Sequence, residues 1–125
     1  MDDRILVALL TDVFLTDLDY LRLRKHLLKA KNSGAILAVL PELPLNSWSP
    51  ATRDSIEEDA ESSGGPRHQV LSRMASEVGI ALLGGAIVAD SRTERRYNTA
   101  LFYDRNGQLI SQYRKIHLPE EEGYW

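Results

Sequence analysis

Ala35-Ile36-Leu37-Ala38-Val39-Leu40-Pro41-Glu42 is the stretch that decides the fold. Residues 35–40 form a continuous apolar run, which is typical of a β-strand covered on both faces. Pro41 ends the run because proline cannot donate a hydrogen bond to a sheet ladder. A similar run occupies residues 5–10, and we expect that strand in the middle of the same sheet.

Between these runs, residues 16–31 have the period of an amphipathic helix. Thr16 is a suitable N-cap, and Gly34 lies just past the C-terminal end. The apolar stripe consists of Tyr20, Leu23, Leu27 and Ala30, widened by Leu21 and Leu28. Strand, helix and strand in this order predict a βαβ unit.

The middle of the chain changes in character. Residues 43–65 are rich in proline, serine and glycine, which predicts a long irregular segment with a short helix near residues 52–61. The acidic side chains of residues 54–61 are expected to be solvated, because nothing in their spacing fixes a metal geometry. A second helix is predicted over residues 66–78, since proline is tolerated in a first turn and Gly79 follows the end.

The remaining elements are predicted to be strands. Residues 80–88 are an apolar run whose Gly84-Gly85 pair favours close packing or a bulge over a phosphate loop, because no helix follows. Asn106-Gly107 separates two β-prone runs, residues 97–104 and 108–115, and this is a strong hairpin signal. Together the elements predict a layered α/β domain.

Composition excludes several classes of protein. The 125 residues include no cysteine, which rules out a disulfide framework, a zinc ribbon and a thiolate nucleophile within them. The 15 basic and 18 acidic residues give a net charge of -3, so no charge footprint for nucleic acid is present. No apolar run approaches the length of a membrane span. We expect a soluble, cytoplasmic protein with no nucleic acid, membrane, cofactor or metal as partner.

Two charged residues stand where strands end. Glu42 follows the carboxyl end of a buried strand, the edge at which ligands bind in open α/β sheets. A carboxylate there can have a raised pKa and act as a base, although for a single carboxylate a helix cap or a surface salt bridge is the more common explanation. Lys115 ends the second hairpin strand. His26, His68 and His117 lack metal-ligand spacing, and we expect His117 to pack or hydrogen-bond near the site.

In order and separation, several motifs along the chain resemble the nitrilase or carbon-nitrogen hydrolase superfamily. The motifs are Val39-Leu40-Pro41-Glu42-Leu43, Gly84-Gly85, Tyr97-Asn98-Thr99-Ala100, Asp104-Arg105-Asn106-Gly107 and Tyr113-Arg114-Lys115-Ile116-His117-Leu118. The lysine motif is the most specific of these. Their joint occurrence makes a chance resemblance improbable.

The resemblance implies a four-layer α-β-β-α sandwich that hydrolyses non-peptide amide, carbamoyl or nitrile carbon-nitrogen bonds. By position, Glu42 would be the general base and Lys115 would stabilise the oxyanion. Glu122 is the best match for a second, orienting glutamate, with Glu121 or a residue beyond the present end as the alternatives. The family's nucleophile is a cysteine downstream of the lysine.

The resemblance covers roughly the first half of the family's domain, and so we expect the chain to end before the nucleophile strand and to be inactive alone. A homo-oligomer or a complementing chain is the expected partner. Two alternatives stay open. One is a non-catalytic interaction or self-assembly module, because half a sandwich leaves apolar faces uncovered. The other is a binder of small molecules or metals that uses Glu42, Glu121, Glu122 and Lys115 without turnover.

Overall fold

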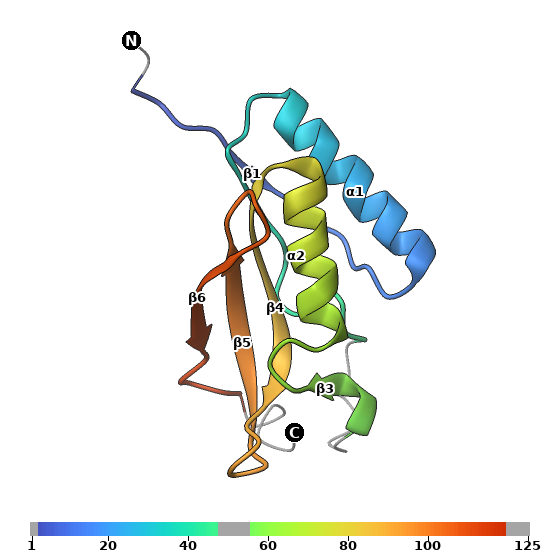
Figure 1. Cartoon of the computed structure of the whole chain (residues 1–125), viewed down its shortest axis with the longest axis vertical. Helices are drawn as coiled ribbons and strands as arrows, with labels where there is room; N and C mark the ends of the chain where they lie inside the picture. Colours follow the sequence, from blue (N-terminus) through green and yellow to red (C-terminus); the bar gives the residue numbers. More distant parts are fainter. Residues whose placement is uncertain (1–2, 48–55, 120–125) are drawn as a thin grey trace.

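The computed structural model describes residues 3–47 and 56–119, whose path is shown in Figure 1. The helices are α1 (Asp17–Asn32), the short 3-10 helix η2 (Glu57–Asp59) and α2 (Pro66–Val78). The strands are β1 (Val7–Leu9), β2 (Leu37–Val39), β3 (Ala60–Glu61), β4 (Ala81–Ala89), β5 (Arg96–Tyr103) and β6 (Leu109–Arg114). They form one sheet in the order β1-β2-β4-β5-β6, with β3 paired to β4.

The predicted βαβ unit is confirmed. β1 and β2 are parallel neighbours, and β2 is also parallel to β4. Helix α1 begins where the sequence predicts, because the Thr16 hydroxyl accepts a hydrogen bond from the Asp19 backbone N–H. The Asp19 carboxylate accepts one from the Thr16 backbone N–H in return. This reciprocal pair is a capping box, which satisfies backbone donors that the first helical turn leaves unpaired.

The position predicted for residues 5–10 is wrong for the described part of the chain. Strand β1 ends the order of the sheet, and its described strand neighbour is β2. The side chains of Ile5 and Leu9 are 71% and 74% exposed. A continuous apolar run shows that both faces of a strand are apolar, but it carries no information on how many strands lie beside it.

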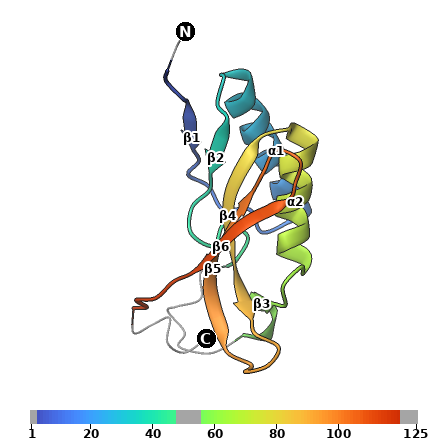
Figure 2. The same ribbon diagram turned by 60° about the vertical axis from the view of Figure 1, so that its left-hand side comes forward.

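Helices pack against only one of the two faces of the sheet in the described part of the chain. Helices α1 and α2 lie on one face (Figure 2). Strand partners that face the helices belong to or pack against the core, and they include Ala8, Ala38, Leu82 and Tyr103. Partners on the opposite face are half-buried or exposed, and they include Leu9, Val39, Leu83 and Phe102. The described residues therefore build one helical layer and one sheet layer.

The apolar stripe of α1 is narrower than predicted. Leu23 and Leu27 are fully buried against the sheet, as the helical spacing predicts. Leu21 and Leu28, expected to widen the stripe, are 59% and 38% exposed. Because a helix on the surface of a single sheet buries one stripe, leucines flanking that stripe stay in contact with solvent.

Helix α2 and the C-terminal hairpin agree with their predicted ranges. Gly79 ends α2 in the left-handed conformation, with φ of 75°. Strands β4 and β5 are antiparallel, as are β5 and β6. A Cβ atom on Gly84 would lie 2.8 Å from Leu71 Cδ2, so α2 packs on β4 at a point where a side chain would not fit. This confirms close packing as the role of that glycine.

The acidic side chains of residues 54–61 were predicted to be solvated, and for two of them this prediction is wrong. Asp59 and Glu61 are 6% and 8% exposed. Glu61 accepts hydrogen bonds from the backbone N–H groups of Arg67 and His68, at 3.0 Å each. Gly65, the N-cap of α2, has no side chain to offer these donors. Glu61 replaces the missing cap, and its negative charge suits a helix N-terminus.

Candidate functional site

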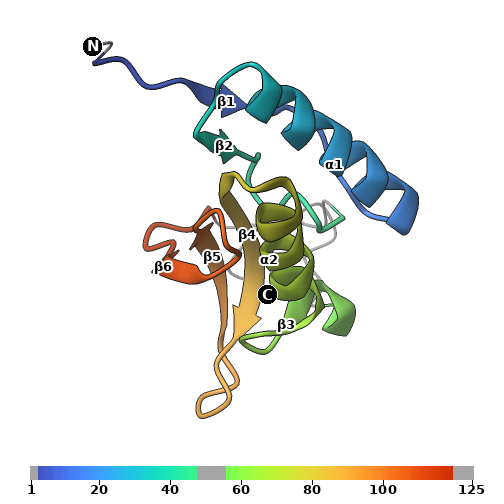
Figure 3. The same cartoon turned by 45° about the horizontal axis from the view of Figure 1, so that its top comes forward.

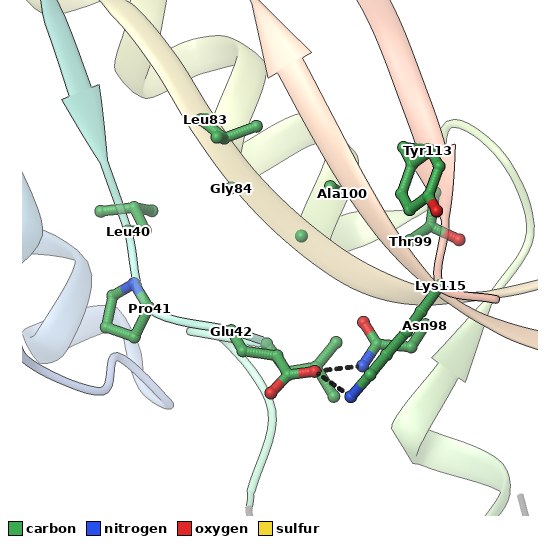
Figure 4. A pocket seen from close by; sticks show the side chains of 12 residues that line it. Leu40, Pro41, Glu42, Leu83, Gly84, Asn98, Thr99, Ala100, Tyr113 and Lys115 are labelled. Carbon is green, nitrogen blue, oxygen red and sulfur yellow. Dashed lines mark hydrogen bonds and ion pairs between the residues drawn. The ribbon is translucent and has the colours of Figure 1, made fainter. Parts of the chain in front are cut away.

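A cavity of about 250 Å³ opens on the helix-free face of the sheet, where β2 ends beside β4, β5 and β6 (Figure 4). Its lining comprises Leu40, Pro41, Glu42, Leu43, Leu83, Gly84, Gly85, Asn98, Thr99, Ala100, Tyr113 and Lys115. Much of the wall is apolar side chain and backbone. The ionisable groups converge at one end, so the cavity combines an apolar wall with a charged end, as ligand sites commonly do.

Backbone geometry fixes Glu42 at this position. The Leu40 N–H donates to Leu83 O, which continues the pairing of β2 as far as the residue before Pro41. Leu43, which follows Glu42, is buried and has φ of 47°. A non-glycine residue in the left-handed region costs free energy and clusters at functional sites. The chain therefore turns sharply at Glu42 and presents its side chain to the cavity.

Strand pairing brings Lys115 to the same place. The Lys115 backbone N–H donates to Asn98 O at 2.8 Å, which extends the β5–β6 ladder by one residue. The Lys115 ammonium then reaches Glu42, with Nζ 2.8 Å from Oε1. Asn98 Nδ2 donates to the same Oε1 at 2.7 Å. Glu42, Asn98 and Lys115 thus form a triangle of contacts, of which Figure 4 draws the two that end on Glu42 as dashed lines.

The pKa of Glu42 is lowered in the structure, whereas the sequence suggested that it could be raised. The hydrogen bond from Lys115 lowers the pKa of Glu42, partial burial raises it by less, and Asn98 together with the Lys115 charge lowers it further. Burial is weak because the Glu42 side chain is 47% exposed. Glu42 is therefore a carboxylate at neutral pH, which can accept a proton but has none to give.

Of the two structural explanations for Glu42, the salt bridge is present, whereas Glu42 caps no helix in the part of the chain that the structure describes. The partner is Lys115, which lies 73 residues away in sequence. The ion pair lies at the end of a cavity, and it joins Glu42 and Lys115, which the sequence identifies as candidates independently of each other. A charged pair in this setting can bind and transfer protons as well as contribute to stability.

The other candidate residues are less informative. His117 is exposed, and it is not among the residues that line the cavity, so the expected packing near the site is not seen. Glu121 and Glu122 lie outside the described residues.

Within residues 3–47 and 56–119, no group of His, Asp or Glu side chains is arranged to hold a metal ion. No helix among the described residues is long and apolar enough to cross a membrane.

Asn98 is the member of the triangle to which the sequence assigns no role. Its side chain is 7% exposed, although it belongs to a mostly apolar strand. Buried amides are almost always hydrogen-bonded, so a lone asparagine in such a strand signals that a polar partner lies opposite. That signal is present in the Tyr97-Asn98-Thr99-Ala100 motif, but the strand pattern alone does not identify Glu42 as the partner.

Known proteins are similar to this chain in sequence and in fold. The model of the carbon-nitrogen hydrolase family matches residues 16–125. A hydrolase of Schizosaccharomyces pombe is 36% identical over 95 residues, which cover 76% of this chain and 29% of that protein. The omega-amidase NIT2 of Homo sapiens is 38% identical over 90 residues, covering 72% of this chain and 31% of the relative. The matched part of the chain thus covers less than a third of the length of these two relatives.

Solved structures agree on the fold. An amidase from Nesterenkonia sp. AN1 superposes with a TM-score of 0.75 at 25% identity, over 98% of this chain and 49% of that one. An N-terminal amidase superposes with a TM-score of 0.71 at 19% identity, over 95% of this chain and 29% of that chain. The mixed α/β arrangement of a sheet with two helices matches these nitrilase-fold amidases.

Proposed function

This chain belongs to the carbon-nitrogen hydrolase family, and we propose that it contributes the base and the oxyanion-binding cation of an amide-hydrolysing site. The observation that carries the proposal is the contact between Glu42 Oε1 and Lys115 Nζ, 2.8 Å long, at the charged end of a cavity. Hydrolysis of a non-peptide carbon-nitrogen bond needs a proton acceptor and a fixed positive charge within reach of one carbon atom.

Glu42 suits the role of general base. Lys115 and Asn98 both bond Oε1, and neither of these donors bonds Oε2. We propose that Oε2 is the oxygen that receives the proton of a thiol nucleophile. Because the pKa of Glu42 is lowered, the base is in its working, ionised form at neutral pH.

The 125 residues contain no cysteine, so the proposed thiol belongs to residues outside this sequence. In the first step the sulfur attacks the carbonyl carbon, its proton passes to Glu42, and the resulting oxyanion is stabilised by Lys115. Collapse of that intermediate breaks the carbon-nitrogen bond, and Glu42 returns the proton to the leaving nitrogen, which departs as ammonia or an amine. Water then attacks the thioester carbon and gives a proton to Glu42. Collapse of this second intermediate breaks the carbon-sulfur bond, and Glu42 returns the proton to the sulfur, so that the acid and the free thiol are released.

A small amide is the proposed substrate class. The cavity of about 250 Å³ suits a small compound, and Leu83, Ala100 and Tyr113 form an apolar wall for its non-reacting end. Relatives named omega-amidases support an amide over a nitrile or carbamoyl group. Glu122 is proposed as a second acid that orients the attacking group.

A second candidate function rests on the helix-free face. Leu9 is 74% exposed and continues a row of apolar partners, Val39 and Leu83, across the sheet. Exposed apolar surface of this kind marks a binding face. We propose that a second copy or a complementing chain covers it. Sedimentation velocity at micromolar concentration should show a dimer or larger species, whereas a stable monomer would count against this candidate.

The catalytic proposal is tested with two proteins. The 125-residue chain alone should release no ammonia from a small primary amide, because it has no thiol. A fusion of these residues to the cysteine-bearing remainder of an omega-amidase relative should release ammonia. A folded fusion that is inactive beside an active intact relative would contradict the proposal, and so would turnover by the isolated chain.

A further inference from the structure

Asn98 is the most buried of the three polar residues that meet at the charged end of the cavity. The whole residue is 7% exposed, whereas the side chains of Lys115 and Glu42 are 31% and 47% exposed. All three line the same cavity. An ion pair between two long, partly exposed side chains is weakly held. The buried amide is therefore the member of the site best suited to fix its geometry.

Strand pairing holds the backbone of Asn98 on both sides. Strand β5, which contains this residue, lies between β4 and β6 in the sheet (Figure 3). Asn98 is in register with Ile87 of β4, and its carbonyl accepts a hydrogen bond from the Lys115 backbone N–H at 2.8 Å. Its side chain, in turn, bonds the Glu42 carboxylate. One residue thus contacts both of the groups to which the proposed chemistry assigns a role.

The chemistry of the contact decides which end of the amide faces Glu42. A carboxylate only accepts hydrogen bonds, so the atom 2.7 Å from Oε1 is the Nδ2 donor. Lys115 Nζ donates to the same oxygen at 2.8 Å. A carboxylate oxygen has about two lone-pair sites, and these two donors take both of them on Oε1. A proton that arrives at Glu42 is therefore directed to Oε2.

We propose that Asn98 is a positioning residue of the amide-hydrolysing site, which holds Glu42 Oε1 so that Oε2 takes the proton of the thiol. This inference rests on the function proposed above for Glu42 and Lys115. As the sulfur-hydrogen bond breaks, the proton forms a bond to Oε2, and the sulfur electron pair attacks the carbonyl carbon. Both donors stay on Oε1 during this step. Asn98 acts through Glu42 and not by contact with the reacting atoms.

A neutral donor suits this role better than a second cation. The hydrogen bond from Lys115 lowers the pKa of Glu42 most, and the one from Asn98 lowers it further against the opposing effect of partial burial. A second positive charge at the same distance would lower the pKa of Glu42 still more, and a weaker base takes up the proton of a thiol less readily. The Asn98 amide restrains the carboxylate without adding charge.

Asn98→Leu is the first variant, because leucine has a similar size and no donor. In the 125-residue chain, carbon-13 NMR of the glutamate carboxyl groups should show the pKa of Glu42 rising toward 4.5. Asn98→Asp keeps the shape of the side chain and places a second carboxylate against Glu42. It should raise the apparent pKa of Glu42 more, because two adjacent carboxylates do not both ionise readily.

Asn32→Leu, at the exposed last residue of α1, is the matched control and should leave the Glu42 titration unchanged. An unchanged Glu42 titration in a folded Asn98 variant would overturn the proposal, because it would show that the amide does not bond the carboxylate.

The fusion with the cysteine-bearing part of an omega-amidase relative measures the catalytic consequence. Without the amide, the Glu42 carboxylate can rotate about its last torsion, which is broad for glutamate. Asn98→Leu should therefore lower kcat about 10-fold or more at pH 7, with KM within about twofold of the parent. The acidic limb of the kcat/KM profile should move to higher pH, because it reports the base of the free enzyme.

A purely structural role of Asn98 would lower the thermal midpoint and the amount of active protein without moving the acidic limb. That result would overturn the proposal. A raised KM with parental kcat would also overturn it, because it would assign Asn98 to substrate binding.

Glu42→Gln in the same fusion separates this inference from the proposed function. If Glu42→Gln loses activity whereas Asn98→Leu keeps the parental kcat and acidic limb, only the positioning role of Asn98 fails. If both variants keep the parental rate, the assignment of Glu42 as the base fails, and the role of Asn98 fails with it.

Discussion

At the scale of single residues, the site depends on three side chains that the chain brings together from distant positions. The sequence singles out Glu42 and Lys115 because each follows a strand and each matches a family motif. It does not predict the direction of the Glu42 pKa. That direction depends on the 2.8 Å distance to Lys115, a residue 73 positions away, and on the hydrogen bond from Asn98. Distances between residues so far apart in sequence become known only with the fold.

Lys115→Met should raise the pKa of Glu42 toward its ordinary value of 4.5, because the substitution removes both the hydrogen bond and the positive charge. The pKa is measured by carbon-13 NMR of the glutamate carboxyl groups of the 125-residue chain during an acid titration. Lys25→Met, on the exposed surface of α1, is the matched control and should leave the Glu42 curve unchanged.

The sign of the linked stability follows from the same shift. Since the folded chain lowers the pKa of Glu42, its charge stabilises the fold above the unfolded value of 4.5. That contribution is lost as the pH falls through the lowered value. An unaltered Glu42 titration in Lys115→Met would contradict the ion pair.

At the scale of helices and strands, local sequence signals predict where a helix or strand begins and ends better than they predict which of its side chains are buried. The bounds of α2 and the Asn106-Gly107 hairpin follow from residues at the element ends, which act within a few positions. The burial of Glu61 is different, because it arises from two backbone donors of α2 that need an acceptor. Nothing within the acidic segment itself reveals that need.

Gly107→Ala should destabilise the fold more than Gly34→Ala. Both glycines have positive φ, at 83° and 93°. A Cβ atom at Gly107 would lie 2.6 Å from Ser72 O, whereas nothing lies within 4 Å of one at Gly34. Gly34→Ala therefore reports the left-handed backbone alone, about 1–2 kcal/mol. The clash at Gly107 should add a further cost of about 1–3 kcal/mol.

Urea denaturation of the two variants gives the free energies of unfolding. The difference between them isolates the contact between the hairpin turn and α2 from the cost of the backbone conformation. An equal decrease in the free energy of unfolding in the two variants would show that the hairpin turn does not pack against α2 as closely as the structure indicates.

At the scale of the whole molecule, the helices and the proposed site lie on opposite faces of one sheet. The α/β class follows from the alternation of apolar runs and helical periods. The number of layers does not, because a run such as residues 35–40 shows apolar faces without showing what covers them. In the described residues α1 and α2 cover one face, and the cavity with Glu42 and Lys115 opens on the other.

This arrangement explains how the chain can hold the residues of the proposed site on a packed sheet. The core under the helices holds β2, β4 and β5 in register, and the carboxyl end of β2 and the end of β6 then bring the carboxylate to the ammonium. In the proposed site, the segment that brings the thiol would pack against the apolar surface that the described residues expose around this pair.

The most direct test of the proposed chemistry is the amide turnover rate of Glu42→Gln in the fusion with the cysteine-bearing part of an omega-amidase relative. Glutamine keeps the shape of Glu42 but cannot take the thiol proton, so kcat should fall about 100-fold or more. Glu57→Gln, an exposed residue of η2, is the control and should retain the parental rate. A Glu42→Gln rate within about twofold of the parent, in a protein with the same thermal midpoint, would contradict the assignment of Glu42 as the base.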